Sequence, residues 1–442
     1  MAVIYLVPPV SYTCPNNTTC CDDPTFDTSV FKRTIATEFH LICDKSWLQS
    51  FFQTLFQSGV MAGSLMFGIA SDRYGRRPAV IVAVMLELCT GIIAAFMTGY
   101  WSFTFVRMIT GAATGGIMVV TFVLLMEFIG TDKRSMFSAI FHVPFAMGHM
   151  SLPLFAYFYR DYVQFQFAIS VANVIVLIYI CLLPESPRWL LAMNKVNEVV
   201  TILTKVAIIN KMPTDTIRQA VEQYHINYHV SSIPKGSVAD LFRTSNLRRN
   251  IVVMSFTWFA CSFSFFGMAQ YVSYLTGDIF LNVFASGAVC FCACLVAIPM
   301  LTFMKRKKAV AICNATCGVC LLIIAFIPDG ILGMVFACLG MLLNFLVFII
   351  IYLYCTEMFP TVVRNAALGF SSMMARVGSM IAPFVVALKP HGQWCAPVLF
   401  GVLPLISAVL CLMLPETKDI RLMTTLEEGE AIGQSSRKIG TK

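Results

Sequence analysis

Two apolar stretches of this chain end in matching segments, Met126-Glu127-Phe128-Ile129-Gly130-Thr131-Asp132-Lys133-Arg134 and Thr356-Glu357-Met358-Phe359-Pro360-Thr361-Val362-Val363-Arg364. In each, an arginine follows a glutamate by seven residues, and the copies lie 230 residues apart (364 − 134 = 230). Further on, Pro184-Glu185-Ser186-Pro187-Arg188-Trp189 and Pro415-Glu416-Thr417-Lys418 repeat a second motif, 231 residues apart (415 − 184 = 231). A membrane protein of two similar halves is typical of alternating-access transport, with the substrate site between the halves.

Composition supports a membrane protein. Hydrophobic residues make up 58% of the 442 residues and charged residues 12%, about half the charged share of a soluble protein. Eleven apolar runs have roughly the length that a membrane-spanning helix needs. They are residues 47–67, 78–98, 102–127, 136–158, 163–183, 250–275, 279–303, 309–327, 331–356, 366–388 and 395–414. In lipid, the backbone N–H and C=O groups of a span can hydrogen-bond only within that span, which requires a helix. The runs do not alternate polar and apolar residues, as the strands of a β-barrel would. We therefore predict an all-α membrane protein with two pseudo-symmetric helical halves.

The net charge of +8 is concentrated in short loops between the predicted spans. Residues 73–77 hold three arginines, residues 133–134 are Lys-Arg, and residues 305–308 are four basic residues. These loops share one side if the spans alternate in direction. Positive loops mark the cytoplasmic side of a membrane, so we predict that these loops lie inside and bind no nucleic acid.

The predicted domain order follows from this topology. It comprises an extracellular Cys-rich segment (1–46), a first half of five spans (47–183), a cytoplasmic loop (184–249), a second half of six spans (250–415) and a cytoplasmic tail (416–442). In the loop, Val196, Val199, Leu203 and Val206 share one face of a predicted helix over 195–209, and Thr214-Asp215 can begin another. The tail is polar, and we predict that it is disordered.

The halves are predicted to be unequal, with five spans before the loop and six after it. Residues 1–10 are apolar but too short to cross a bilayer, and they lack the basic region of a signal peptide. The simplest interpretation is that a first span is missing through truncation, splicing or an incomplete gene model. A true eleven-span protein with an outside N-terminus is the alternative.

Cysteines and sequons agree with an outside N-terminal segment. Four of the 17 cysteines crowd that segment: Cys14, Cys20, Cys21 and Cys43. An even number in an oxidising compartment favours disulfides, with three possible pairings. Asn16-Asn17-Thr18-Thr19 contains two overlapping sequons, so Asn16 and Asn17 are predicted glycosylation sites.

One loop suggests a gate. Gly68-Ile69-Ala70-Ser71-Asp72-Arg73-Tyr74-Gly75-Arg76-Arg77-Pro78 carries more charge than a topology signal alone requires. Its Asp can lie near the positive N-terminus of a helix in the other half, and its arginines can pair with carboxylates such as Glu127. The second-half counterpart, Met304-Lys305-Arg306-Lys307-Lys308, lacks the Asp and the glycine. The predicted gating residues are Asp72, Arg73, Arg76, Glu127, Arg134, Glu357 and Arg364.

These motifs resemble the major facilitator superfamily and, within it, the organic cation, organic anion and carnitine transporter family. The gate loop, the Glu-to-Arg repeats and the Pro-Glu-Ser-Pro-Arg-Trp string resemble superfamily signatures shared with sugar transporters. The segments 26–44 and 240–249 resemble the end of this family's Cys-rich ectodomain and its string before the second half. The resemblance implies twelve spans, and the eleven predicted here would correspond to all but the first.

Arg376 is the main indication of substrate class. It lies about ten residues into the span 366–388, where an arginine costs roughly 2.5–3.5 kcal/mol and therefore normally faces a cavity or a partner. Its position resembles that of an arginine in the family's anion and carnitine carriers. A guanidinium would bind a carboxylate through two hydrogen bonds. The alternative is a structural pair with a neighbouring group.

Aromatic residues and a histidine complete the predicted site. Trp258, Phe265 and Phe266 lie in an aromatic-rich span and resemble substrate-contacting positions of the family. They would stack on organic ions, although aromatic stripes often serve packing alone. His142 is predicted to face the cavity, whereas His149 is predicted to be a hydrogen-bonded core residue.

The sequence predicts a multi-pass plasma-membrane transporter of small organic ions, with a preference for anions or zwitterions such as carnitine-like compounds. The alternatives are an organic cation uniporter and a transport-dead interaction or sensing protein. No phosphate-binding nucleotide loop or catalytic spacing is found, so we expect neither an enzyme nor a cofactor or metal. The expected partners are the substrate and the lipid bilayer, and the sequence does not give the oligomeric state.

Overall fold

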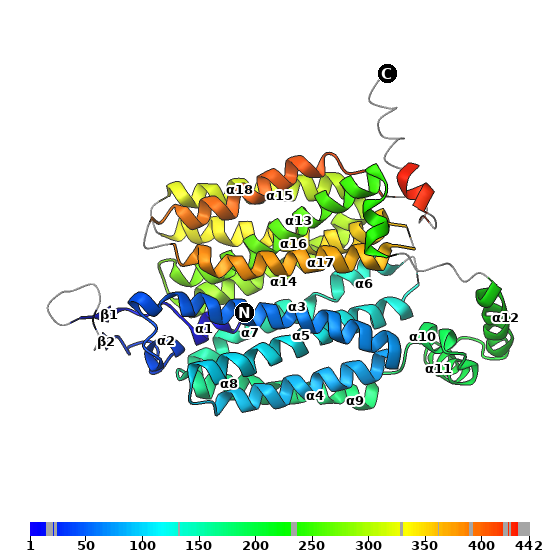
Figure 1. Ribbon diagram of the computed structural model, residues 1–442, viewed down its shortest axis with the longest axis horizontal. Coiled ribbons are helices and arrows are strands. Elements are labelled where there is room, and N and C mark those ends of the chain that lie inside the picture. The colour runs from blue at the N-terminus through cyan, green and yellow to red at the C-terminus, as the bar shows by residue number, and fades with distance from the viewer. Residues whose placement is uncertain are drawn as a thin grey trace, which may run out of the picture.

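Long helices run side by side along the longest axis of the molecule (Figure 1). The computed structural model describes residues 1–14, 21, 24–130, 133–230, 237–327, 330–360, 362–388, 392–418, 423 and 426–431. The elements before the bundle are α1 (Val3–Leu6), β1 (Tyr12–Thr13), β2 (Thr25–Phe26), α2 (Ile35–Glu38) and η2 (Cys43–Lys45). β1 and β2 pair antiparallel, with Tyr12 opposite Phe26.

The first half of the bundle contains five predicted spans, two of them built from consecutive short helices. Its helices are α3 (Trp47–Tyr74), α4 (Arg76–Ala95), α5 (Tyr100–Phe128), α6 (Arg134–Ile140), α7 (Val143–Phe158), α8 (Tyr162–Ala172), η4 (Asn173–Leu177) and α9 (Ile178–Leu182). The loop between the halves forms α10 (Pro187–Ala192), α11 (Val196–Ile209), α12 (Ile217–Val230) and η5 (Val238–Phe242).

The second half follows the loop and lies above the first in Figure 1, coloured green to red. Its helices are α13 (Ser245–Tyr271), η6 (Val272–Tyr274), α14 (Ile279–Phe303), α15 (Arg306–Phe326), α16 (Ile331–Met358), α17 (Arg364–Val386) and α18 (Cys395–Cys411). The structure therefore confirms an all-α membrane protein of two helical halves.

Within the described residues, nine segments are long and apolar enough to cross a membrane by length and composition. The other two predicted spans are α3, which ends in the charged gate loop, and α18, which has 17 residues. Both pack in the bundle, α3 against α5 and α17, and α18 against α13 and α15. The count of eleven spans stays a prediction.

The two ends of the bundle differ in character. We call the end that carries β1, β2 and α2 the disulfide end, and the end that carries α10, α11 and α12 the basic end (Figure 1). Helix α3 runs from the disulfide end to the basic end, and α17 runs back beside it.

The halves touch each other towards the disulfide end. Ser50 Oγ on α3 donates a hydrogen bond to the carbonyl of Pro383 on α17, at 3.0 Å. On the opposite side, His149 of α7 and Ser286 of α14 are hydrogen-bonded at 3.3 Å. Next to that bond, a Cβ added to Gly287 would lie 2.7 Å from the Met150 backbone, so only glycine permits this approach. The prediction that His149 is a hydrogen-bonded core residue is confirmed.

The helices of the two halves are buried to different extents. In the second half, α13 packs against α16, α17 and α18, and 78% of the residues in the most apolar stretch of Ser245–Tyr274 are buried. In the most apolar stretch of residues 162–182 in the first half, 18% of the residues are buried. The last helices of the first half therefore expose more of their apolar surface than α13 does.

The predicted disordered tail is partly wrong. Glu416 accepts hydrogen bonds from the amides of Arg306 and Lys307, so the second half extends past residue 415. Residues 426–431 form a helical turn whose Glu430 accepts from the amides of Asn246 and Leu247 at the start of α13. A carboxylate favours that position because the helix N-terminus carries free N–H groups and positive charge.

Candidate functional site

A cavity of about 720 Å³ lies between the halves and reaches the basic end. Four helices provide most of its wall: α3, α5, α16 and α17. The lining side chains belong to the basic-end portions of these helices, for example Met61 to Asp72 on α3. Exposed side chains of Asp72 and Arg188 lie at its mouth. With contacts at the disulfide end and an opening at the basic end, the structure presents one state of an alternating-access cycle.

Arg376 lines this cavity from α17, as predicted. It keeps only 6% of its surface exposed, and its Nε has no hydrogen-bond partner. The neutral phenol of Tyr352 interacts electrostatically with the guanidinium and also lines the cavity. A buried guanidinium with a free donor is costly, so the position suits a ligand with acceptor oxygens.

Tyr352, Trp258 and His142 form an aromatic cluster next to the cavity. Tyr352 lies 4.4 Å from Trp258 between ring centroids, and His142 lies 5.5 Å from Tyr352. His142 Nδ1 is 2.8 Å from the carbonyl of Ser138, whose side chain lines the cavity. Trp258 is 1% exposed, and its indole Nε1 has no hydrogen-bond partner. Trp258 and His142 therefore support the wall, and Tyr352 forms it.

The structure does not place Phe265 or Phe266 at this cavity. The ring of Phe265 packs against that of Phe345, with 5.4 Å between centroids. It also packs against the ring of Phe145 in the other half, with 6.2 Å between centroids. The described residues that line the cavity include none of Trp258, Phe265, Phe266 and His142. Phe265 and Phe266 lie further towards the disulfide end of α13, where the halves are in contact. Their contact with substrate stays a prediction.

Arg76 forms the first of two matching charge networks. Its Nη2 lies 3.1 Å from Glu127 Oε1 and 2.9 Å from the carboxylate of Asp72. Its backbone amide donates to Glu185 at 2.9 Å, and its Nη1 donates to the carbonyl of Ser71. The predicted pairing of this loop with Glu127 is confirmed.

Arg306 forms the second network, 230 residues later. It donates to both carboxylate oxygens of Glu357 at 3.3 Å, to Glu416 through its amide at 2.8 Å, and to the carbonyl of Leu301. Thr302 occupies the position equivalent to Asp72, so this network lacks the third carboxylate. Sequence reasoning missed Arg306 as a site residue, although the offset 306 − 76 = 230 identifies it.

The two loops differ at one backbone position. Gly75 has φ 109°, and a Cβ there would lie 2.5 Å from Glu185. Lys305, the equivalent residue, has φ −68° and an ordinary extended conformation. The same arginine network is therefore built on two different turns, and only the first requires glycine.

The remaining predicted gating residues take other positions. Asp72 pairs with Arg76 of its own half, and 68% of its side chain is exposed. Arg73 is exposed and lies over the ring of Tyr74 at 5.4 Å. Arg364 lines the cavity and donates to the carbonyl of Phe359 at 3.3 Å. Arg134 begins α6, but its side chain lies outside the described part of the structure.

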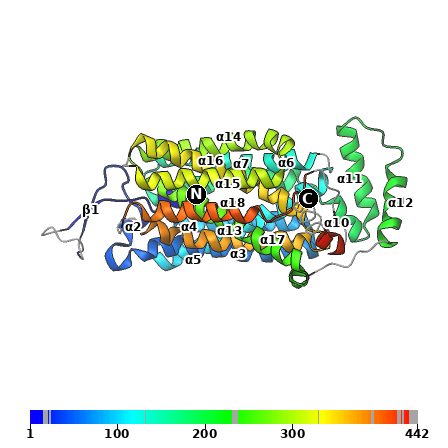
Figure 2. The same ribbon diagram turned by 90° about the horizontal axis from the view of Figure 1, so that it is seen from above.

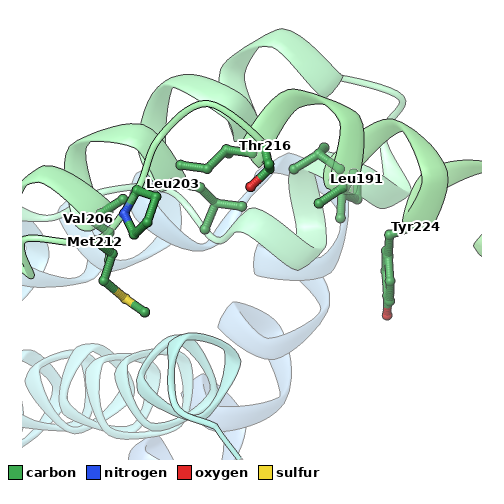
Figure 3. Close-up of a pocket in the computed structure, with 11 residues that line it drawn as sticks. Leu191, Leu203, Val206, Met212, Thr216 and Tyr224 are labelled. Carbon is green, nitrogen blue, oxygen red and sulfur yellow. The ribbon is translucent and has the colours of Figure 1, made fainter.

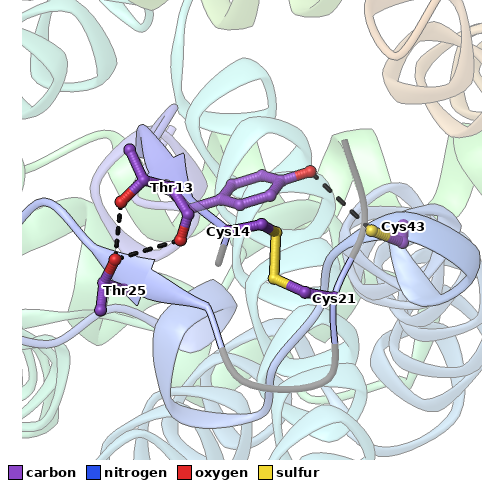
Figure 4. The surroundings of a disulfide bond; sticks show 6 residues. Thr13, Cys14, Cys21, Thr25 and Cys43 are labelled. Carbon is purple, nitrogen blue, oxygen red and sulfur yellow. Dashed lines mark hydrogen bonds between the residues drawn. A yellow bond between two sulfur atoms is a disulfide. The ribbon is translucent and has the colours of Figure 1, made fainter. Parts of the chain in front are cut away.

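Figure 4 shows Cys14, Cys21 and Cys43 at the disulfide end. Cys14 and Cys21 form a disulfide beside the paired strands, where the hydroxyls of Thr13 and Thr25 lie 2.6 Å apart. Cys43 is also disulfide-bonded, and its sulfur lies 3.9 Å from the hydroxyl of Tyr12. The other predicted residues of this segment lie outside the described residues: Asn16, Asn17 and Cys20.

Known proteins resemble this chain along nearly all of its length. Residues 11–428 match the family described as sugar (and other) transporter. The organic cation transporter protein of Drosophila melanogaster is 34% identical over 427 residues, which cover 95% of this chain and 78% of the relative. Human solute carrier family 22 member 16 is 32% identical, with 96% and 74% covered. The chain belongs to solute carrier family 22 of the major facilitator superfamily.

Solved structures show the same fold. The xylose symporter XylE, bound to a glucose derivative, superposes with a TM-score of 0.70 at 18% identity, covering 90% of this chain and 93% of XylE. Solute carrier family 22 comprises membrane transporters of organic ions and not enzymes, which confirms those predictions for this member. The similar members include one called an organic cation transporter protein and also member 6 of Pseudopleuronectes americanus, at 30% identity.

Proposed function

We propose that this family member carries small organic anions across the plasma membrane by alternating access, with Arg376 binding the anionic group of the substrate. The burial of Arg376 at the cavity wall, with Nε unpartnered, is the observation that carries the proposal. A carboxylate there would accept two hydrogen bonds from the guanidinium.

The charge of the cavity supports an anionic substrate. Five arginines and three carboxylates line it. Two of the carboxylates, Glu127 and Glu357, are already engaged by Arg76 and Arg306. The third, Asp72, lies at the exposed mouth. A zwitterion is compatible with this site if its cationic group contacts the ring of Tyr352 instead of a carboxylate.

A second candidate is an organic cation transporter. The name of the Drosophila relative favours it. A cation carrier needs a carboxylate to bind the substrate deep in the cavity, near the level of Arg376. The carboxylates among the described cavity residues instead lie at the basic end.

Uptake by Arg376 variants distinguishes these candidates. We expect Arg376→Lys to weaken anion uptake, because it keeps the charge but loses the two-pronged geometry. Arg376→Ala should remove a charge-assisted hydrogen bond of roughly 1.5–3 kcal/mol, about one to two decades in affinity. Arg376→Asp should disfavour anions further.

Radiolabelled anionic, zwitterionic and cationic probes provide the measurement, and surface biotinylation provides the control for folding. Normal anion uptake by a well-expressed Arg376→Ala protein would contradict the proposal. Cation uptake that is unchanged by all three substitutions would favour the second candidate.

The charged residues at the cavity mouth are proposed to form the gate. In this open state Asp72 contacts Arg76 within its own half. Closing the basic end would bring Asp72, Arg134 and Arg364 against the other half, where Asp72 could exchange Arg76 for a new partner. Glu127 and Glu357 would hold Arg76 and Arg306 in place through the cycle.

A further inference from the structure

The loop helices α11 and α12 form a hairpin with an apolar groove of about 590 Å³. Figure 3 shows Val206, Leu203 and Met212 at one end of this groove and Tyr224 at the other. The hairpin has its own small core, in which Leu190 and Val199 are 1% and 0% exposed. The groove shares Leu203 and Val221 with this core and extends beyond it to Met212 and Tyr224.

Apolar side chains beside the groove are exposed. Ile208 is 63% exposed, Ile209 79% and Met212 63%. Ile208 and Ile209 end α11, and Met212 follows in the turn to α12 after Asn210 and Lys211, so this edge combines apolar and polar residues. Exposed apolar edges of this kind mark interaction surfaces in folded proteins.

Two lysines flank this edge. Lys205 lies three and four residues before Ile208 and Ile209, so it neighbours both on the helix surface. Lys211 directly precedes Met212, and both lysines are exposed. Among the acidic residues nearby, Glu198 pairs with Lys195 at 3.1 Å and Glu222 pairs with Arg218 at 3.7 Å, whereas Asp215 is exposed in the turn. The described residues that line the groove include no carboxylate.

The hairpin lies close to the membrane surface. Helix α10 begins at Pro187, five residues after α9 ends at Leu182, a reach of at most about 17 Å. Figure 2 shows α11 and α12 running across the direction of the bundle helices, and therefore along the membrane plane. Apolar residues flanked by lysines on a helix in this orientation are typical of attachment to anionic lipid.

We propose that the α11–α12 hairpin docks on the anionic phospholipids of the leaflet at the basic end. Ile208, Ile209 and Met212 insert among the acyl chains, and Lys205 and Lys211 bind lipid phosphates. Because the hairpin joins the two halves, this contact would couple the transporter to the lipid composition of that leaflet.

Fluorescence quenching in proteoliposomes tests the proposal on the full-length protein. A fluorescent amino acid is introduced at position 209 by amber suppression, with position 222 on α12 as the control. The vesicles contain phosphatidylcholine with or without phosphatidylserine, and a lipid with a nitroxide on its acyl chain is the quencher. We expect strong quenching at position 209 in phosphatidylserine vesicles and weak quenching at position 222.

Charge variants identify the contact. Lys205→Gln and Lys211→Gln should each lower the docked-to-undocked ratio about five-fold. Lys195→Gln removes a lysine already paired with Glu198 and should leave the quenching unchanged. Equal quenching at positions 209 and 222, or no effect of removing both lysines, would overturn the proposal. So would self-quenching at position 209 that rises with protein density, because it would identify a second copy as the occupant.

Discussion

At the residue scale, the repeated sequence motifs correspond to repeated contacts. Arg76 and Arg306 each bind one glutamate through the guanidinium and another through the backbone amide. The arginines keep about a tenth of their side chains exposed, at 10% and 9%. A charge buried to this extent requires a partner, so each network acts as a unit that fixes the basic end of its half.

A double-mutant cycle tests this view of the networks. We expect Glu127→Gln or Arg76→Ala alone to destabilise the protein by about 3 kcal/mol, near the lower limit for breaking a buried pair because Glu127 remains 16% exposed. The double variant should cost less than the sum of the two. Thermal unfolding of the purified protein is the measurement. Strictly additive losses would show that the pair does not act as a unit, and Arg73→Ala, at an exposed position, is the control.

At the element scale, the approach of α7 to α14 closes the disulfide end. Gly287 permits the close contact with Met150, and the His149–Ser286 hydrogen bond lies beside it. The position of this contact, away from the cavity, sets which side of the bundle is open in this structure.

Adding one methyl group at this contact should open the disulfide end. In Gly287→Ala, the new Cβ would lie 2.7 Å from the Met150 backbone, so α7 and α14 must separate. We expect faster amide hydrogen exchange in both helices around residues 149 and 287. Gly148→Ala is the matched control, because nothing lies within 4 Å of its added Cβ. If both variants exchange alike, the contact does not hold the halves together.

At the scale of the whole molecule, the two ends of the bundle indicate how the protein is oriented in the membrane. Cys14–Cys21 and the disulfide-bonded Cys43 suit an oxidising compartment, and the basic loops gather at the opposite end. We therefore propose that the disulfide end is extracellular and the basic end cytoplasmic.

Glycosylation offers a direct test of this orientation. We expect Asn16 or Asn17 to carry a glycan, so that glycosidase treatment lowers the apparent mass of the protein from intact cells. A variant with both asparagines replaced by glutamine should run at the lower mass without treatment. An unshifted band, together with thiol labelling of Cys14 and Cys21 without reduction, would place this end inside the cell.

The sequence by itself determined the helical class, the two halves, the family and the positions of the charged motifs. Apolar run length and the 230-residue repeat are local properties of the chain, so they can be read without coordinates. It also identified Arg376, because an arginine in an apolar span needs a cavity or a partner, however that span packs.

Only the tertiary structure decided which residues share the cavity. Tyr352 reaches the wall and Trp258 stands behind it, although both are aromatic residues of apolar spans. Arg306 was missed although the repeat marks its position, whereas part of the tail was mistaken for disorder because Glu430 binds Asn246, 184 residues away along the chain. Helix rotation and the packing of the halves select these neighbours, and neither is encoded in the periodicity of a single segment.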